Sequence, residues 1–492
     1  MLIIFTFILR KILITHLGIE YQGVLAVFAS VIGFLSILEL GVGSAITYSM
    51  YQPIIQKDYT KLKALFNYYN QTYKKILISI FVIGLSITPF LGVFIKGIVL
   101  NFEIYIGYIL YLLSIVISYS YASSVSLISA HQKTYKINIT NSIVLILQHA
   151  IEIIILIYTK NFIIYISIKI FSTILLYFIY KKILNNEYNY ILKCENVNLG
   201  DTEVADLKKN INAMLYHQIG GSLVFNIDNI VISGISGVII LGFYSNYNTI
   251  LISIVSIVSL IYSPITAWVG SLFVVKTKQE IEAYYRLIFN TNYIISFSIF
   301  TATFLSIDKF LVLWIGSSYI LEKTTVIVLV SNTFINFLRQ PTLLFRNAAG
   351  LFYYDRKKPI YEGITNLILS IILALIIGPV GVIIATIITN LSITYLIEPF
   401  VLFKYGFNKS PNKFYFKQYI YAITFILTII FSTIFKNITF ISNEYIDFLI
   451  HVIVGMIFGF IVSIFSLIIS KEFKNYIQGI MLYILRREKN VK

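Results

Sequence analysis

Charge is scarce in this 492-residue sequence, because only 12% of its residues are Asp, Glu, Lys or Arg, against about 25% in soluble domains. Cysteine is nearly absent, and the single Cys194 excludes a disulfide within one chain. The sequence holds no G-x-x-x-x-G-K-[ST] phosphate loop, no G-x-S-x-G nucleophile elbow and no H-E-x-x-H zinc motif. The five histidines are scattered singly. These absences argue against a water-soluble protein, ATP hydrolysis, enzymatic activity, a metal site and a cofactor.

Long apolar runs dominate what is present, since 58% of the residues are hydrophobic and the mean hydropathy is +0.84. Runs of about 20 uncharged residues match a helix that crosses a hydrocarbon core roughly 30 Å thick. Backbone amides in lipid must be satisfied internally, which favours helices. The sequence therefore predicts an all-α polytopic membrane protein with about fourteen transmembrane helices. The predicted spans are 2–17, 23–50, 76–96, 105–130, 138–159, 162–180, 211–233, 238–272, 288–307, 326–350, 361–377, 381–403, 419–435 and 446–470.

The placement of basic residues sets the orientation of these spans. With the N-terminus in the cytoplasm, the loops and tail on the cytoplasmic side hold 28 of the Lys and Arg residues. The opposite loops hold five, namely Lys96, Lys160, Lys309, Lys323 and Lys436. This asymmetry agrees with the positive-inside rule. We therefore expect both termini in the cytoplasm, and the net charge of +16 needs no nucleic-acid partner.

The most polar interruption of the sequence falls between the sixth and seventh spans and divides the chain into two bundles. The predicted parts are an N-terminal lobe of helices one to six (1–180), a cytoplasmic linker (181–210), a C-terminal lobe of helices seven to twelve (211–403), two further helices (404–470) and a basic amphipathic cytoplasmic tail (471–492).

Ionisable residues inside the spans are the main candidates for function, because they are costly in lipid and tend to face a cavity or a partner. They are Arg10, Lys11, Glu39, Glu152, Lys169, Asp228, Arg339, Arg346 and Glu398. Asn332, Asn336, Arg339 and Arg346 fall at offsets of 0, 4, 7 and 14, on one helical face. Pro341 is expected to kink that helix. Two guanidinium groups on one intramembrane face suit a multivalent anion such as a pyrophosphate.

Several of these residues also have a purely structural interpretation. Arg346 lies near the predicted cytoplasmic end of its span, where its side chain can reach the lipid headgroups. Arg10 and Lys11 can flank a first helix that starts after them. Glu398 precedes Pro399 near a membrane face, so we interpret it as the end of a helix.

The acidic residues leave further alternatives open. Asp228 lies between Asn226 and Asn229 in "NIDNIVISG". This polar group suits a cation site, a proton site or a hydrogen bond between helices. Glu152 and Lys169 are expected to pair with each other across adjacent helices.

Small residues recur beside Glu39 in the second span, where they permit close contact between helices. They are Ala26, Ala29, Gly33, Ser36, Gly43 and Thr47. Glu39 is therefore either a structural lock that pairs with Arg10 or Lys11, or a titrating group, and we favour the lock. Gly455–Gly459 matches the GxxxG pattern, which is common by chance.

Taken together, several segments resemble Wzx-type polysaccharide flippases of the multidrug/oligosaccharidyl-lipid/polysaccharide exporter superfamily. The similar segments are "LGIEYQGV" (Leu17–Val24), "ELGVGSAITYSMYQPIIQKDYTKLKALFNYY" (Glu39–Tyr69), "NIDNIVISGISGVIILGFYSNYNTI" (Asn226–Ile250), "RNAAGLFYYDRKKPIYEGITNLILSI" (Arg346–Ile371), "GPVGVIIATIITNL" (Gly378–Leu391) and "EPFVLFKYGF" (Glu398–Phe407). The resemblance covers nearly the whole chain.

The resemblance implies two six-helix lobes around a cationic central cavity, with alternating access driven by an ion gradient or membrane potential. The expected substrate is an undecaprenyl-pyrophosphate-linked repeat unit, moved from the inner to the outer leaflet of a bacterial plasma membrane for capsule synthesis. By position, Arg10, Glu39, Asp228 and Arg346 match motif residues of the family. One departure is that relatives usually carry a longer segment before the first helix.

These considerations give a set of expected site residues. The expected substrate-binding residues are Arg10, Arg339, Arg346, Asn332 and Asn336, and the expected ion-coupling or structural residues are Glu39 and Asp228. The alternatives are a MATE-like multidrug/cation antiporter, and a membrane polysaccharide polymerase or glycosyltransferase, which the short external loops disfavour. The expected partners are membrane lipids and the lipid-linked glycan. Association with a polysaccharide polymerase and glycosyltransferases is a further hypothesis.

Overall fold

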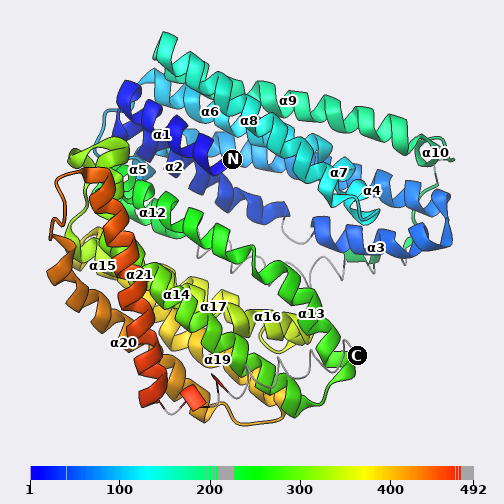
Figure 1. The fold of residues 1–492 in the computed structure, drawn as a ribbon. Helices are drawn as coiled ribbons and strands as arrows, with labels where there is room; N and C mark the ends of the chain where they lie inside the picture. The colour runs from blue at the N-terminus through cyan, green and yellow to red at the C-terminus, as the bar shows by residue number, and fades with distance from the viewer. Residues whose placement is uncertain are drawn as a thin grey trace. The chain divides into compact units, whose positions relative to one another are not determined.

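The computed structural model describes residues 2–39, 42–195, 197–201, 203–205, 207–208, 226–470, 472–474 and 476–477. Within these residues the regular structure is helical (Figure 1), and the chain is an all-α polytopic membrane protein. Ten helical segments in this part are long and apolar enough to cross a membrane: Tyr59–Phe94, Phe102–Ala130, Thr134–Thr159, Phe162–Glu187, Val238–Ser259, Lys278–Ile315, Lys358–Ile377, Pro379–Phe407, Asn412–Lys436 and Glu444–Ile469. Contacts divide the chain into unit 1, residues 1–242, and unit 2, residues 243–492.

Unit 1 is built mainly from long helices joined by short turns. Its elements are α1 (Leu2–Leu17), α2 (Ile19–Leu35), η1 (Ser36–Glu39), α3 (Val42–Gln56), α4 (Tyr59–Ile87), η2 (Thr88–Phe90), α5 (Leu91–Phe94), α6 (Phe102–Ser118), η3 (Tyr119–Tyr121), α7 (Ala122–Ala130), α8 (Thr134–Thr159), α9 (Phe162–Glu187) and α10 (Asn189–Leu192), with a helical stretch at 226–236 and the first residues of α12 (Val238–Ser259). The prediction of one continuous span over 23–50 is wrong, because α2 ends at Leu35 and Glu39 closes a short 3₁₀ turn. Residues 211–225 of the seventh predicted span lie outside the described residues.

Glycines of α2 and α3 allow close helix contacts inside unit 1. A Cβ on Gly23 would lie 1.9 Å from the carbonyl oxygen of Val238, and one on Gly33 would lie 2.6 Å from the side chain of Asn226. A Cβ on Gly43 would lie 3.1 Å from the Tyr69 hydroxyl. At Gly33 and Gly43, the small-residue stripe does mark close contacts, as predicted.

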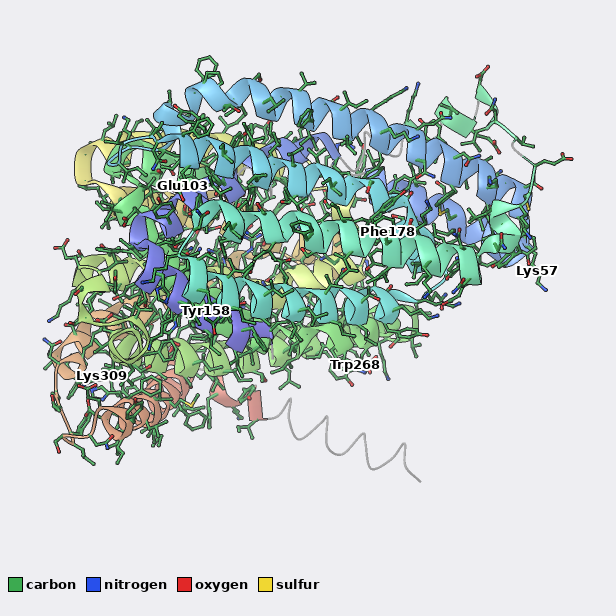
Figure 2. All side chains as sticks on the ribbon, turned by 90° about the horizontal axis from the view of Figure 1, so that it is seen from above. Lys57, Glu103, Tyr158, Phe178, Trp268 and Lys309 are labelled. Atoms are coloured by element: carbon green, nitrogen blue, oxygen red, sulfur yellow. The ribbon has the colours of Figure 1, made fainter. Side chains whose placement is uncertain are left out.

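The two ends of unit 1 carry different polar residues. Figure 2 shows Lys57, at the turn between α3 and α4, at one end of the unit, and Glu103 and Tyr158 toward the other end. Glu103 accepts a hydrogen bond from the Tyr21 hydroxyl at 2.8 Å. The predicted topology also puts Lys57 on the opposite side of the membrane from Glu103 and Tyr158.

Unit 2 surrounds one very long helix, α14. Its elements are α13 (Tyr262–Val275), α14 (Lys278–Ile315), η4 (Ser317–Tyr319), α15 (Lys323–Leu338), α16 (Gln340–Ala348), η5 (Leu351–Tyr353), α17 (Lys358–Ile377), α18 (Pro379–Thr389), η6 (Asn390–Thr394), α19 (Tyr395–Val401), η7 (Leu402–Phe407), α20 (Asn412–Lys436) and α21 (Glu444–Ile469). The predicted cytoplasmic loop 273–287 is largely helical, since Thr277 and Glu280 form a capping box that starts α14 at Lys278.

Aromatic rings and glycines hold α14 to its neighbours. Tyr293 stacks on Tyr421 of α20 with ring centroids 3.7 Å apart. On the α21 side, a Cβ on Gly455 would lie 2.5 Å from the Cα of Ala302. A Cβ on Gly459 would lie 2.8 Å from the Cα of Ser298. The GxxxG match of α21 is therefore a close helix–helix contact and not a chance occurrence.

The predicted amphipathic tail, 471–492, lies outside the described residues except for 472–474 and 476–477. Within those residues, Glu472 pairs with Lys417 of α20 at 3.1 Å and lies 3.8 Å from Arg286 of α14. These contacts attach the start of the tail to unit 2.

Candidate functional site

The candidate site in unit 2 begins where the tenth predicted span breaks. Helix α15 ends at Leu338 and α16 begins at Gln340, so Arg339 lies at the junction, just before Pro341. Proline has no N–H, and its ring obstructs the preceding turn. The predicted kink is confirmed as a break between two helices. The sequence predicted that Arg339 and Arg346 share one face of a continuous helix. Because the helix breaks between them, that prediction is wrong.

Side chains from other helices satisfy the carbonyls that this break exposes. Asn292 of α14 donates to the Phe337 carbonyl, which has no partner N–H at Pro341, at 3.2 Å, and to the Leu338 carbonyl at 3.4 Å. The Tyr395 hydroxyl donates to the Ile335 carbonyl at 2.8 Å. Irregular backbone in a membrane protein needs such partners, because no water is available in the lipid core.

A second proline of this unit, Pro399, lies inside α19, with π-helical turns η6 and η7 on either side. Pro399 offers no N–H to the Tyr395 carbonyl, four residues earlier, and the Gln418 side chain of α20 donates to that carbonyl at 3.0 Å. Wide turns of this kind occur frequently at functional sites.

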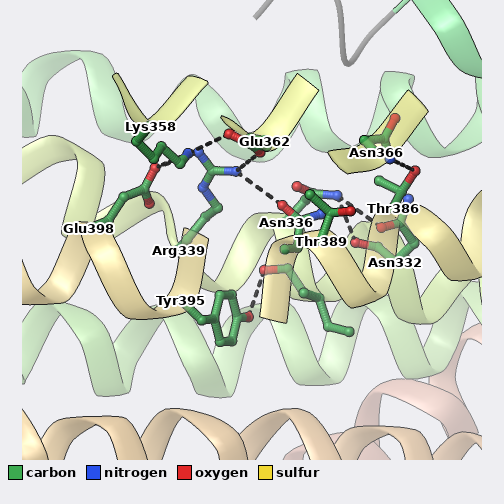
Figure 3. A network of polar contacts seen from close by, with 12 residues as sticks. Asn332, Asn336, Arg339, Lys358, Glu362, Asn366, Thr386, Thr389, Tyr395 and Glu398 are labelled. Atoms are coloured by element: carbon green, nitrogen blue, oxygen red, sulfur yellow. Dashed lines mark hydrogen bonds and ion pairs between the residues drawn. The ribbon is translucent and has the colours of Figure 1, made fainter. Parts of the chain in front are cut away.

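A network of ion pairs lies close to Pro341 and Pro399 in the sequence and joins the segments that carry them (Figure 3). Arg339 bonds Glu398 at 2.7 Å and lies 3.9 Å from Glu362. Lys358 bridges the two carboxylates, at 2.9 Å from Glu398 and 2.7 Å from Glu362. The network thus joins the α15–α16 junction to α17 and α19.

Arg346 extends this network toward the end of α16. It forms an ion pair with Asp355 and lies 4.0 Å from Glu398. Asp355, Lys358 and Glu398 are all at most 5% exposed. The interpretation of Arg346 as a residue that reaches only lipid headgroups is therefore wrong.

The network is formally neutral, because its cations Arg339, Arg346 and Lys358 equal in number its carboxylates Asp355, Glu362 and Glu398. Buried charges persist only when they are paired, and removing one partner leaves an uncompensated charge in a region of low dielectric. The ion pairs therefore hold the α15–α16 segment, α17 and α19 in one arrangement. If one of these segments moved, the ions would have to exchange partners.

Glu398 is the centre of the network, which corrects its interpretation as a helix end. It is 1% exposed, lies inside Pro379–Phe407, and faces three cations. Asp355, Lys358 and Glu362 were not among the expected site residues. Asp355 and Lys358 fall in residues 351–360, which were predicted to be a loop, whereas Glu362 lies inside the predicted span 361–377. The spacing of Lys358 and Glu362, four residues apart, was a signal for an intrahelical ion pair.

Amides continue the polar row away from the ions (Figure 3). Asn336 donates to the Asn332 side chain at 3.1 Å, and Asn366 of α17 donates to Thr386 of α18 at 3.0 Å. Asn332 and Asn336 are half-buried and lie on α15, the helix that ends just before Arg339. The structure thus brings Asn332, Asn336, Arg339 and Arg346 into one unit.

The other expected residues lie in unit 1. Arg10 and Lys11 both lie inside α1, so neither precedes the helix, and Arg10 is half-buried whereas Lys11 is exposed. Glu39 accepts a hydrogen bond from the Tyr73 hydroxyl at 2.6 Å. Glu39 forms no ion pair with Arg10 or Lys11 in the described part of the chain, so the predicted ionic lock is wrong.

The remaining acidic residues of unit 1 have local surroundings. Asn229, next to Asp228, donates to Ser30 of α2 at 2.9 Å, which confirms a hydrogen bond between helices for part of that polar group. Glu152 is fully buried and accepts from Gln148 at 2.8 Å.

Glu152 also lies 2.9 Å from His149 Nδ1. Lys169 lies 4.6 Å from the centre of the Tyr111 ring. No ion pair joins Glu152 to Lys169, two residues that the structure describes, so that prediction is wrong. Among the described residues, no group of three or more His, Cys, Asp and Glu side chains could hold a metal ion.

No protein-family model and no curated protein matches this sequence. Solved structures of membrane transporters do match. An inward-facing multidrug resistance MATE family transporter of the MOP superfamily has a TM-score of 0.58 at 13% identity, over 79% of this chain and 91% of that one. The lipid II flippase MurJ, in an inward closed conformation, has a TM-score of 0.61 at 15% identity, over 95% of this chain and 97% of that one. The chain therefore shares the fold of these transporters.

Proposed function

We propose that this protein is a flippase that moves an undecaprenyl-pyrophosphate-linked oligosaccharide across a bacterial plasma membrane for capsule or surface polysaccharide synthesis. The observation that carries the proposal is the fold match to the lipid II flippase MurJ, which extends over 95% of this chain. The family resemblance of the motifs around Arg10, Glu39 and Arg346 supports the same substrate class. Alternating access driven by an ion gradient or the membrane potential supplies the energy.

In this proposal Arg10 is a ligand of the pyrophosphate, because a guanidinium group forms paired, charge-assisted hydrogen bonds with phosphate oxygens. Arg339 and Arg346 are the proposed phosphate ligands of unit 2, where they would exchange Glu398 and Asp355 for the substrate. Asn332 and Asn336 of α15 bind sugar hydroxyls.

Glu39 and Asp228 are the proposed ion-coupling residues. The neutral hydroxyl of Tyr73 is the donor to Glu39, so the carboxylate can gain a proton or a cation without displacing an existing positive charge. We place the N- and C-termini in the cytoplasm on the basis of the Lys and Arg distribution.

Translocation of a fluorescent undecaprenyl-pyrophosphate-linked oligosaccharide in proteoliposomes tests the proposal. We expect Arg10→Gln to lower the rate about tenfold or more, since one charge-assisted hydrogen bond to phosphate is worth well over 1 kcal/mol. Lys11→Gln is the matched control, because Lys11 is the exposed neighbour on the same helix, and it should leave the rate unchanged. A wild-type translocation rate in Arg10→Gln would show that Arg10 does not bind the pyrophosphate.

A MATE-like cation antiporter is the second candidate, because the MATE transporter of the MOP superfamily matches this fold with a TM-score of 0.58. The same proteoliposomes distinguish the two functions. Exchange of an organic cation for protons or Na⁺, with no movement of the lipid-linked glycan by the wild-type protein, would support the antiporter and overturn the flippase.

A further inference from the structure

A hollow of about 360 Å³ lies in unit 2, at the turn between α16 and α17. Its wall carries Tyr353, Arg356, Lys357 and Tyr361, and its lining also includes Asp355 and Lys358. We call it the Arg356 hollow. Its volume falls within the roughly 300–1,000 Å³ of small-molecule sites. It lies beside the start of α17, one of the ten segments apolar enough to cross a membrane.

The charges of the Arg356 hollow fall into two groups. Asp355 and Lys358 are buried and face inward, where they pair with Arg346 and with Glu362 and Glu398. Arg356 and Lys357 are exposed, and neither forms an ion pair with a residue that the structure describes. The hollow therefore presents two positive charges that no carboxylate of the described residues neutralises.

Arg356 is held in an orientation that suits a phosphate. Its guanidinium carbon lies 3.9 Å from the centre of the Tyr353 ring. Stacking of this kind covers the face of the guanidinium group, and its N–H donors point outward in the plane of the group. Those donors form paired hydrogen bonds with phosphate oxygens.

The tyrosines place the hollow in an environment typical of the membrane surface. Tyr353, Tyr354 and Tyr361 are 66%, 51% and 58% exposed, and Tyr354 stacks on Tyr405 with ring centroids 3.8 Å apart. Exposed tyrosines beside an apolar helix are typical of the level of the lipid headgroups. A phosphate that reaches the hollow while attached to a lipid therefore meets both basic residues at the depth where lipid phosphates lie.

We infer that the Arg356 hollow is a binding site for the pyrophosphate of a polyprenyl lipid, where the headgroup first binds before it is translocated. The inference rests on the proposed function and deepens it. Arg356 and Lys357 bind the phosphates. Lys358, which lines the same hollow and also pairs with Glu398, links this first binding step to the buried ion network.

Equilibrium binding of undecaprenyl pyrophosphate to the full-length protein in phosphatidylcholine nanodiscs tests the site. We expect Arg356→Gln/Lys357→Gln to raise the Kd about 30-fold, because each basic residue near a lipid phosphate contributes roughly fivefold. Both side chains are exposed, so the melting temperature should not change. Lys181→Gln/Lys182→Gln, an exposed basic pair at the end of α9, is the matched control and should keep the wild-type Kd.

Three outcomes would overturn the site. The first is an unchanged Kd in the Arg356/Lys357 variant, and the second is an equal loss in the Lys181/Lys182 control. The third is competition by phosphatidylglycerol at the same concentration as undecaprenyl pyrophosphate, which would make the hollow a general contact for anionic lipids. Inorganic pyrophosphate should compete weakly, and competition equal to that of the lipid would assign the site to free pyrophosphate.

The translocation assay separates this inference from the proposed function. If the wild-type protein translocates the glycan and the Arg356/Lys357 variant binds normally, only the hollow is misassigned. If the wild-type protein neither binds undecaprenyl pyrophosphate nor translocates the glycan, the proposed function fails, and the inference fails with it.

Discussion

The two units treat their buried carboxylates differently. In unit 1, Glu39 accepts from the hydroxyl of Tyr73, and the fully buried Glu152 accepts from the amide of Gln148 and lies 2.9 Å from His149 Nδ1. In unit 2, Glu398 faces three cations, and Asp447 of α21 pairs with Lys309 of α14. Dipolar donors stabilise a carboxylate without cancelling its charge, whereas an ion network cancels it. These carboxylates of unit 1 therefore lie beside side chains without a permanent charge, whereas those of unit 2 are held by Lys and Arg side chains whose removal would leave a buried charge uncompensated.

The largest expected effect is that of Glu398→Gln, which tests whether the ion network holds unit 2 together. The change leaves the three cations of the network with two carboxylates, and removing one partner of a buried pair costs about 3–5 kcal/mol. We expect a clear fall in the melting temperature of the detergent-solubilised protein. Glu322→Gln, at an exposed carboxylate in the same unit, should leave it unchanged. A wild-type melting temperature for Glu398→Gln would mean that the network does not hold unit 2 together.

The next effect concerns the backbone beside the network. Gln418→Leu leaves the Tyr395 carbonyl without its donor, and an unsatisfied buried carbonyl costs about 1–3 kcal/mol. Pro399→Ala restores an N–H to α19, so Gln418→Leu should cost less in that background. A double-mutant cycle with unfolding as the readout measures the coupling. Equal costs of Gln418→Leu in both backgrounds would show that Pro399 does not create the need for Gln418.

A Glu→Gln change in unit 1, at Glu39, is the counterpart of Glu398→Gln in unit 2. Glu39→Gln keeps an oxygen that accepts from Tyr73, so we expect a loss of stability below about 1 kcal/mol. If Glu39 also couples transport to an ion, the translocation rate of this variant should lose its dependence on the ion gradient. Tyr73→Phe serves as the control, because it removes the same hydrogen bond but keeps the carboxylate. A destabilisation as large as that of Glu398→Gln would erase the difference between the units.

The smallest effect is expected at the exposed ion pair of Lys61 and Glu203, whose side chains are 45% and 41% exposed. The hydrogen bond from Lys61 lowers the pKa of Glu203. Its contribution is therefore present above the unfolded pKa and is lost as the pH falls through the lowered folded value. Exposed pairs are worth about 0–1 kcal/mol. Glu203→Gln should change the melting temperature at neutral pH by no more than a degree or so, and a larger shift would contradict this assignment.

Much of the fold could be predicted from the sequence, because membrane-spanning helices are determined by apolar runs that are visible in composition alone. The break at Pro341 was also predicted, since proline acts locally. The positions of Glu398 and Lys358 could not be predicted in the same way. Apart from the local pair of Lys358 and Glu362, their partners come from helices distant in sequence, and a charge beside a proline or in a polar turn looks like a helix end until the tertiary contacts are known.

The expected ionic lock of Glu39 failed for a related reason. Its sequence neighbours suggested a cation within the same helical pair, but the helix stops at Leu35 and Glu39 instead reaches Tyr73 of α4. Tyrosine is so common in this chain, with 38 residues, that its sequence position gave no signal of that contact.

The side-chain donors beside Pro341 and Pro399 also constrain how this sequence can vary. Asn292 donates to the carbonyl to which Pro341 offers no N–H, and Gln418 donates to the carbonyl to which Pro399 offers none. Losing the amide while its proline is present leaves a buried carbonyl with a missing donor, and replacing the proline restores a backbone N–H. Each proline and its distant amide should therefore be inherited together, and the amide should be lost only in a relative that has already lost the proline.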